Sequence, residues 1–274
     1  MTDIMAVIHR YAPRDFVPKI GIILGSGLAS LAEQIENPIS IPYQAIPGLV
    51  SSEVAGHASL LVMGYLNGVP IVCLRGRLHL YEGLSYAPIR TLVRIVKNLG
   101  CSIFIVTCAA GSMLREAGPG DLMMITDHIN FQPGSPLVGP NDESIGPRFL
   151  PMENAYDLDL QEVMEEAAGR LHIPLSKGVY LSTLGPCFET PAEIRAFMTL
   201  GANAVGMSVV PEVIIARHCG MRVACIAAIT NAAAGLSDEK ITHEHTLQFG
   251  EVAARKLIKL IPEFIKDVTA NGMV

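Results

Sequence analysis

Short apolar runs alternate with amphipathic segments along most of this chain. We expect buried strands where the runs are short, at 19–24, 60–66, 69–74, 102–107, 122–126, 178–182 and 222–230. Apolar residues recur at helical spacing elsewhere, and we expect helices at about 28–35, 88–99, 157–171, 191–200, 210–218 and 242–267. Alternating strands and helices predict an α/β protein, and because no linker interrupts the pattern we expect one domain over residues 1–274.

Two local signals are the clearest in this pattern. Asn67-Gly68 separates two apolar runs, which is the strongest short hairpin signal, so we expect a mixed rather than a wholly parallel sheet. Thr190, Pro191 and Glu193 form a capping box with proline at the first helical position, and Gly201 ends the segment. The sequence therefore defines both where the helix after Thr190 begins and where the loop before it ends.

Composition narrows the classes of function. The chain has 274 residues, of which 50% are hydrophobic and 17% are charged, and its net charge is −6. Such a chain is a poor candidate for broad nucleic-acid binding, although a few local donors can still hold a small anion. Six cysteines without a C-x-x-C pair predict buried free thiols in a reducing compartment. The N-terminus lacks a signal-peptide pattern and no apolar segment reaches membrane-spanning length, so we expect a cytoplasmic protein.

The loop at 183–190 places an aromatic ring beside a carboxylate just ahead of the capped helix. Phe188 can stack on a flat heterocycle, and Glu189 can accept hydrogen bonds from the N–H edge of that heterocycle. The plainer alternative is that Phe188 packs in the core and Glu189 complements the helix dipole.

Gly25-Ser26-Gly27 follows an expected strand and opens an expected helix. Backbone N–H groups, the helix dipole and the Ser26 hydroxyl at such a turn suit a phosphate. A dinucleotide site is disfavoured, because Ser30 stands where the third glycine would fall and no acidic residue follows at the required distance. The alternative is a tight strand-to-helix turn without a ligand.

A second candidate anion site follows the expected hairpin. If strand alternation continues over 75–83, Arg77, His79 and Tyr81 face one side. A guanidinium and an imidazole on one face form a clamp for an oxyanion, whereas a solvated edge strand explains this set poorly.

Several single polar residues are weaker candidates. His57 is more often structural, Met207 is more often a core residue, and Ser208 could cap a helix or bind an anion. Asn231 presents an amide where a strand ends but is also a common turn residue, and His243 begins the last helix, where simple exposure is the alternative. No cluster has metal-ligand spacing and no nucleophile motif is present, so we expect no metal.

Four segments taken together resemble a known family. They are 185–190 (GPCFET), 206–213 (GMSVVPEV), 216–220 (ARHCG) and 229–231 (ITN). The chain resembles the trimeric purine nucleoside phosphorylases, which specialise in 6-oxopurines, and the resemblance runs from Gly25 to the last helix. It implies one α/β domain with a mixed, distorted sheet or barrel flanked by helices, and no metal or organic cofactor.

The resemblance also implies a role for each matching residue. The phosphate site would contain Ser26, His57, Arg77, His79, the backbone of Ala109, and Ser208. The ribose site would contain Tyr81, Met207 and His243. The purine site would contain Phe188, Glu189 and Asn231, lined by Ala110, Val205, Gly206 and Thr230. His79, Glu189 and Asn231 would be the catalytic residues.

The long segment at 131–155 is rich in Pro, Gly and Asn, as expected for a loop that is functional or contacts a partner. Phe149 on this loop matches the aromatic residue that reaches into a neighbouring subunit's ribose site, so the resemblance implies a homotrimer. It implies no nucleic-acid or membrane partner.

The implied reaction is reversible phosphorolysis of inosine- and guanosine-type (deoxy)ribonucleosides in purine salvage, with inorganic phosphate as co-substrate. The chain departs from the family where Cys108 replaces a common Asn and Ala29 a common Gly. Ala232 stands where vertebrate relatives have Lys, and Leu184 where xanthosine-preferring bacterial relatives carry Tyr, which argues against efficient xanthosine cleavage.

Three rival functions remain to be separated. A methylthioadenosine phosphorylase should have a small residue at 189 and an acid at 231, and Glu189 and Asn231 argue against it. A nucleosidase would use water, which an assay without phosphate would reveal. A purine-sensing binding protein would bind nucleoside tightly without phosphate-dependent turnover.

Overall fold

The computed structural model describes residues 1–13, 15–54, 56–238 and 241–274. Over this part of the chain nine strands form one sheet: β1 (Ile20–Ile23), β2 (Glu36–Pro42), β3 (Leu60–Leu66), β4 (Val69–Arg75), β5 (Ile103–Ser112), β6 (Leu122–Asn130), β7 (Leu175–Ser182), β8 (Ala204–Gly206) and β9 (Arg222–Ala232). The α-helices are α1 (Thr2–Ile8), α2 (Tyr86–Asn98), α3 (Leu158–Arg170), α4 (Pro191–Thr199), α5 (Val210–His218) and α6 (His243–Ala270). Short 3-10 helices cover Ala29–Gln34, Tyr43–Ala45 and Leu80–Glu82.

The sheet is mixed and partly closed. Its strand order is β2-β3-β4-β1-β5-β8-β7-β6-β9, and β9 pairs back with β5, so β5, β8, β7, β6 and β9 form a closed barrel. The β2–β3, β3–β4, β5–β8 and β6–β9 pairs are antiparallel, and the other pairs are parallel. The predicted α/β fold with a mixed, distorted sheet or barrel is confirmed.

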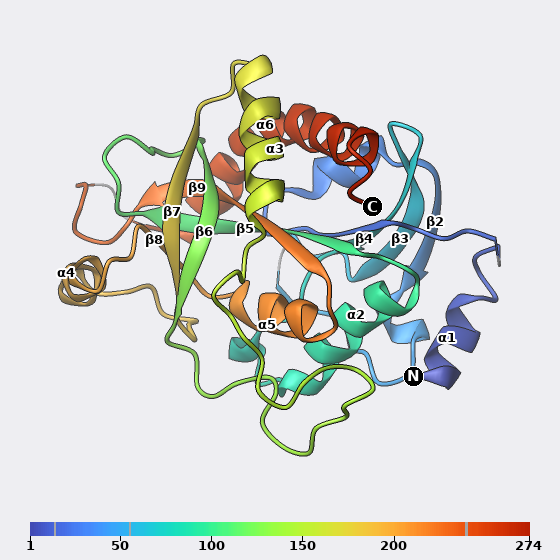
Figure 1. Ribbon diagram of the computed structural model, residues 1–274. Helices are drawn as coiled ribbons and strands as arrows, with labels where there is room; N and C mark the ends of the chain where they lie inside the picture. Colours follow the sequence, from blue (N-terminus) through green and yellow to red (C-terminus); the bar gives the residue numbers. More distant parts are fainter. Residues whose placement is uncertain (14, 55, 239–240) are drawn as a thin grey trace.

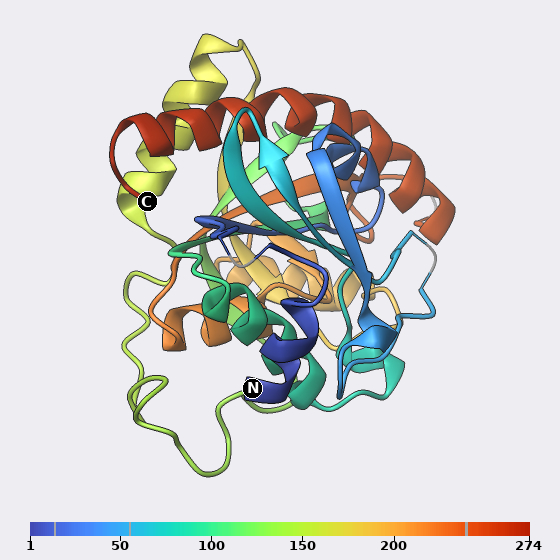
Figure 2. The same ribbon diagram turned by 90° about the vertical axis from the view of Figure 1, so that its right-hand side faces the viewer.

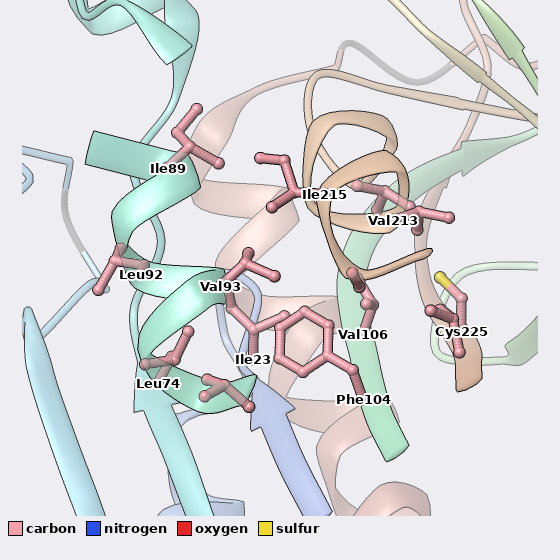
Figure 3. Close-up of a cluster of buried hydrophobic side chains, with 14 of the residues drawn as sticks. Ile23, Leu74, Ile89, Leu92, Val93, Phe104, Val106, Val213, Ile215 and Cys225 are labelled. Atoms are coloured by element: carbon pink, nitrogen blue, oxygen red, sulfur yellow. The ribbon is translucent and has the colours of Figure 1, made fainter. Parts of the chain in front are cut away.

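Helices cover both faces of the sheet. Figures 1 and 2 show α3 and α6 on one side and α2 and α5 on the other. Side chains of β1 point to both sides of the sheet, because Ile20 and Ile22 pack with the α3/α6 cluster whereas Ile23 packs with the α2/α5 cluster. Figure 3 shows Ile23 in the second cluster beside Val93 of α2. Each fully buried aliphatic side chain contributes about 1.5–3 kcal/mol, so these two layers fix the strand ends that carry the site.

The hairpin and the helix boundaries that local sequence patterns predicted are present in the structure. Strands β3 and β4 are antiparallel around Asn67 and Gly68, whose φ angles of 50° and 74° fit a two-residue hairpin turn. Helix α4 begins at Pro191, and both halves of the capping box between Thr190 and Glu193 are present. Helix α5 spans Val210–His218, as expected.

Three expectations near the site were wrong. The segment expected as a helix at 28–35 is a short 3-10 turn at Ala29–Gln34, so no α-helix dipole points at Gly25-Ser26-Gly27. The strand expected at 102–107 is longer, because pairing with β9 carries β5 on to Ser112. Strand β4 ends at Arg75, since Gly76 takes a φ of 112°, so strand alternation does not continue over 77–81.

All six cysteines are free, and five are buried, but Cys187 is exposed on the loop before α4. In the described parts of the chain, no helix combines the length and apolar character needed to cross a membrane.

Candidate active site

A cavity of about 400 Å³ lies where the ends of several strands meet. Its wall comes from the turn after β1, the segment after β4, strand β5, the loop before α4, strand β8, strand β9 and the start of α6. The residues predicted for the site that line this cavity are Ser26, Arg77, His79, Tyr81, Ala109, Ala110, Phe188, Glu189, Val205, Gly206, Met207, Ser208, Thr230, Asn231 and His243. Segments far apart in sequence are thus brought together, while His57 and Phe149 do not line the cavity.

Arg77 is the cationic group of the cavity. Its guanidinium donates from Nη1 to Ser208 Oγ at 2.7 Å and from Nη2 to the Thr107 carbonyl at 2.7 Å. Its Nε lies 3.4 Å from Oε1 of Glu212, and the two side chains are only 1% and 2% exposed. A buried cation needs such an anion nearby, so Glu212 fixes Arg77 in the fold.

His57 lies behind Ser26. Its Nδ1 accepts the backbone N–H of Arg77 at 3.1 Å, which assigns the ring proton to Nε2, and Nε2 then donates to Ser26 Oγ at 3.1 Å. Burial, helped by the nearby His79 and Arg77, lowers the pKa of His57 to about 3, so the ring stays neutral. The Ser26 hydroxyl therefore has its own proton free to point into the cavity.

His79 is paired with Glu82. Oε1 of Glu82 accepts the backbone N–H of His79 at 2.7 Å and lies 3.0 Å from its Nδ1. Burial would raise the pKa of Glu82, but hydrogen bonds from His79 and Ser52 outweigh it and lower the pKa to about 2. The carboxylate is thus an acceptor only, Nδ1 carries the proton, and Nε2 is left for the cavity. The Tyr81 ring stacks on His79 at 4.6 Å, which fixes the imidazole plane.

Glu189 and Phe188 stand at the other end of the cavity. The Thr183 hydroxyl donates to Oε1 of Glu189 at 3.0 Å. Burial raises the pKa of Glu189, opposed by hydrogen bonds from its own backbone N–H and from Thr183. Phe188 is 43% exposed, so the alternative in which its ring packs in the core is wrong, and the ring is accessible for stacking.

The Asn231 amide is oriented by its neighbours. Thr230 Oγ1 donates to Oδ1 of Asn231 at 2.9 Å, and Nδ2 of Asn231 donates to the Ala232 carbonyl at 2.9 Å. The second proton on Nδ2 remains available to a ligand in the cavity. A Cβ on Gly111 would lie 2.8 Å from Nδ2, so a side chain at position 111 would push this amide out of its place.

The turn before α5 is strained. Val209 is a buried β-branched residue with φ 75° and ψ −61°, and Val210 N donates to Ser208 O at 2.9 Å across it. Such a conformation costs about 1–3 kcal/mol and persists only where the surroundings impose it. Ser208 does not cap α5, contrary to one expectation, because its hydroxyl accepts from Arg77 instead.

Gly25 allows β1 to approach β5 closely. A Cβ at position 25 would lie 2.7 Å from the Cα of Cys108. The backbone N–H of Gly25 donates to Thr107 Oγ1 at 3.1 Å, which ties this turn to the strand that also holds Arg77. The turn presents Ser26 to the cavity through this packing and not through a helix N-terminus.

Phe149 lies on the long loop and is 88% exposed. The loop runs below the sheet in Figures 1 and 2, and Arg148 Nη1 donates to the Gly139 carbonyl at 2.6 Å within it. Phe149 is absent from the wall of its own chain's cavity.

Sequence reasoning gave no role to Glu82, Thr107, Thr183 or Glu212. Glu82 stands three residues after His79, a spacing that could have indicated the pair. Glu212 lies inside the quoted segment 206–213, but its partner Arg77 is distant in the sequence, so no local pattern marks it.

Comparisons with known proteins agree on one family. The family model described as "Phosphorylase superfamily" matches residues 19–266. Purine nucleoside phosphorylase 1 of Bacillus subtilis (strain 168) is 49% identical over 248 residues, covering 90% of this chain and 92% of that protein. Purine nucleoside phosphorylase of Rattus norvegicus is 41% identical over 259 residues, covering 92% and 89%. The structure of Schistosoma mansoni purine nucleoside phosphorylase in complex with inosine matches with a TM-score of 0.90 at 38% identity, covering 96% of this chain and 94% of that one. This chain therefore belongs to the purine nucleoside phosphorylase family.

Proposed function

We infer that this chain catalyses the reversible phosphorolysis of purine nucleosides of the inosine and guanosine type. The products are the free base and ribose or deoxyribose 1-phosphate, so the enzyme is a pentosyltransferase. The observation that carries this inference is a single cavity with a buried cationic clamp at one end and a ring, a carboxylate and an amide at the other. Two relatives named purine nucleoside phosphorylase are 41% and 49% identical over most of the chain, and a structural relative was solved in complex with inosine.

The phosphate is bound, in our proposal, by Arg77, Ser26, Ser208 and the backbone of Ala109. Guanidinium and hydroxyl donors suit phosphate oxygens, and burial strengthens each contact. His57 acts by holding Ser26, since it contacts Ser26 and not the cavity. Burial lowers the pKa of His79 despite its hydrogen bond to Glu82, so a neutral Nε2 is available to accept a proton from a phosphate or sugar hydroxyl.

The nucleoside then bridges the two ends. Tyr81, Met207 and His243 line the part assigned to ribose, while Phe188 stacks on the purine. Glu189 accepts the N1–H of a 6-oxopurine, and Asn231 hydrogen-bonds at N7 and O6. As the glycosidic bond stretches, its electron pair moves to the purine and the ribose becomes oxocarbenium-like, as in glycoside cleavage.

Positioning and fixed charges supply most of the catalysis in this scheme. The phosphate oxygen attacks the anomeric carbon as the bond to the purine nitrogen breaks, and the departing base is stabilised by Asn231 and Glu189. No covalent enzyme intermediate is required. We also propose that neither a metal nor an organic cofactor takes part, so full activity should survive a chelator.

The deciding experiment is a panel of inosine, guanosine and adenosine assayed with and without phosphate. We expect inosine and guanosine to be cleaved only with phosphate, with ribose 1-phosphate as product, and adenosine to react far more slowly. Adenine has no N1 proton and has an amino donor at C6, which leaves buried polar groups unpaired. Release of base without phosphate would indicate a nucleosidase, and tight binding without turnover would indicate a sensor.

We further propose a homotrimer in which Phe149 of one subunit closes the ribose side of its neighbour's cavity. The support is the 88% exposure of this large apolar ring, the length of its loop and its absence from its own cavity. The free cysteines fit a reducing compartment, and we place the reaction in cytoplasmic purine salvage.

A further inference from the structure

Thr183 is the residue that holds the Glu189 carboxylate. It follows β7 directly, and its hydroxyl oxygen lies 3.0 Å from Oε1 of Glu189 and 3.4 Å from the Gly206 carbonyl. The Gly206 carbonyl already accepts the Thr183 backbone N–H at 2.8 Å. A hydroxyl has one proton to donate, so the nearer acceptor, Glu189, receives it.

Thr183 itself is rigidly placed. Its backbone is bonded to β8 through Gly206, and its carbonyl accepts Nε2 of the buried Gln132 at 3.2 Å. Glu189 is held from the other side, because the next residue is the cap of α4. The hydroxyl therefore fixes which way the carboxylate faces in the cavity.

This contact has a consequence for base selectivity. A Thr hydroxyl that donates to Oε1 stabilises the ionised carboxylate, which can only accept hydrogen bonds. An acceptor matches the N1–H of a 6-oxopurine, whereas the bare N1 of a 6-aminopurine requires a donor such as a protonated carboxyl group.

We propose that Thr183 is a positioning residue that sets the preference for 6-oxopurines by keeping Glu189 oriented as a hydrogen-bond acceptor. This inference rests on the function proposed above. None of the residues that bind phosphate touches Thr183 among the contacts described, so the effect should be confined to the base.

The test uses Thr183→Val, which removes the hydroxyl while keeping the shape, and Thr183→Ser, which restores a hydroxyl. In Thr183→Val, kcat/KM for inosine should fall about tenfold or more, the size expected for one charge-assisted hydrogen bond. The kcat/KM for adenosine should stay the same or rise, so the inosine-to-adenosine ratio of kcat/KM should fall by at least that factor. The KM for phosphate should not change, and Thr183→Ser should recover most of the ratio.

Thr126→Val is the matched control, because Thr126 is half-buried like Thr183 and its hydroxyl, on β6, donates to the Gly178 carbonyl at 3.4 Å. It should leave the ratio unchanged. If Thr183→Val lowers inosine and adenosine cleavage in parallel, or if Thr183→Ser does not restore selectivity, the inference is wrong. If the wild-type enzyme fails to cleave inosine with phosphate, the proposed function fails instead, and the two failures are thereby distinguished.

Discussion

Replacing Glu212 with glutamine tests whether Glu212 holds Arg77 in the proposed phosphate site. Glutamine keeps the shape of Glu212 but removes its charge, 3.4 Å from Arg77 Nε. Arg77 would then be a buried cation with hydrogen bonds only to the neutral oxygens of Ser208 and Thr107. Removing one partner of a buried ion pair costs about 3–5 kcal/mol, so the free energy of unfolding without phosphate should fall by about that amount.

Phosphate should reverse part of this loss. If phosphate binds at Arg77 as proposed, it would be the remaining anion beside Arg77 in the Glu212→Gln variant, whereas in the wild type it would share Arg77 with Glu212. We therefore expect the KM for phosphate to fall while the KM for inosine changes little. A ligand at a hundred times its dissociation constant stabilises the folded state by about 2.7 kcal/mol, and tighter binding makes this gain larger in the variant at equal phosphate.

The assay is urea unfolding at one protein concentration, with and without phosphate. Glu263→Gln is the control, because Glu263 pairs with Lys266 at 3.6 Å on the surface and should contribute less than about 1 kcal/mol, independent of phosphate. If Glu212→Gln is as stable as the wild type without phosphate, or gains no more from phosphate, the reasoning about the buried pair is refuted.

Three further changes test other parts of the site. Glu189→Ala should lower kcat/KM for inosine by a factor that corresponds to about 2–4 kcal/mol of transition-state free energy. The circular dichroism spectrum and the melting temperature should stay near wild type, because the Thr190–Glu193 box still caps α4. Near-normal kinetics would mean that Glu189 only complements the helix dipole. Phe149→Ala should raise the KM for nucleoside roughly tenfold to a hundredfold and the KM for phosphate much less, and an active monomer at high dilution would contradict this. The pKa of His57 is about 3 in the folded protein, against an ordinary value of 6.5. The contribution of neutral His57 to folding stability is therefore complete above pH 6.5 and is lost as the pH falls towards 3. The loss is up to about 1.4 kcal/mol per pH unit. Urea unfolding between pH 7 and pH 4 should therefore be less pH-dependent in His57→Gln than in the wild type, and identical slopes would show that His57 ionises freely.

Local chemistry explains which elements the sequence predicted. The turn at Asn67-Gly68 and the box between Thr190 and Glu193 depend on neighbouring residues, so their patterns are complete within a few positions. The three-residue strand β8 and the edge strand β2 were missed, because β8 is too short to show a period and β2 contains Pro38 and Pro42. The extension of β5 to Ser112 depends on pairing with β9, which no pattern within 108–112 could indicate.

Arg77, His79 and Tyr81 line one cavity as predicted, but strand alternation is not the reason. Alternation along a strand was expected to place Arg77, His79 and Tyr81 on one face. The strand ends at Arg75, and a 3-10 turn at Leu80–Glu82 follows Gly76. The three side chains still line the same cavity, because the turn and the pairing of Glu82 with His79 direct them there.

The site is best understood as pairs of residues, each with one member in the cavity wall and one behind it. His57 stands behind Ser26, Glu82 behind His79, Glu212 behind Arg77 and Thr183 behind Glu189. Ser26, Arg77 and His79 follow strands, and Glu189 precedes a capped helix, so the sequence marked all four as candidates. His57 and Glu212 are far in sequence from the groups they hold, and Thr183 lies six residues before Glu189. Such partners set the charge and direction of each wall residue before substrate arrives, which is what electrostatic catalysis requires. Substitution of a residue behind the wall should therefore change selectivity or ligand affinity without removing any group that touches the substrate.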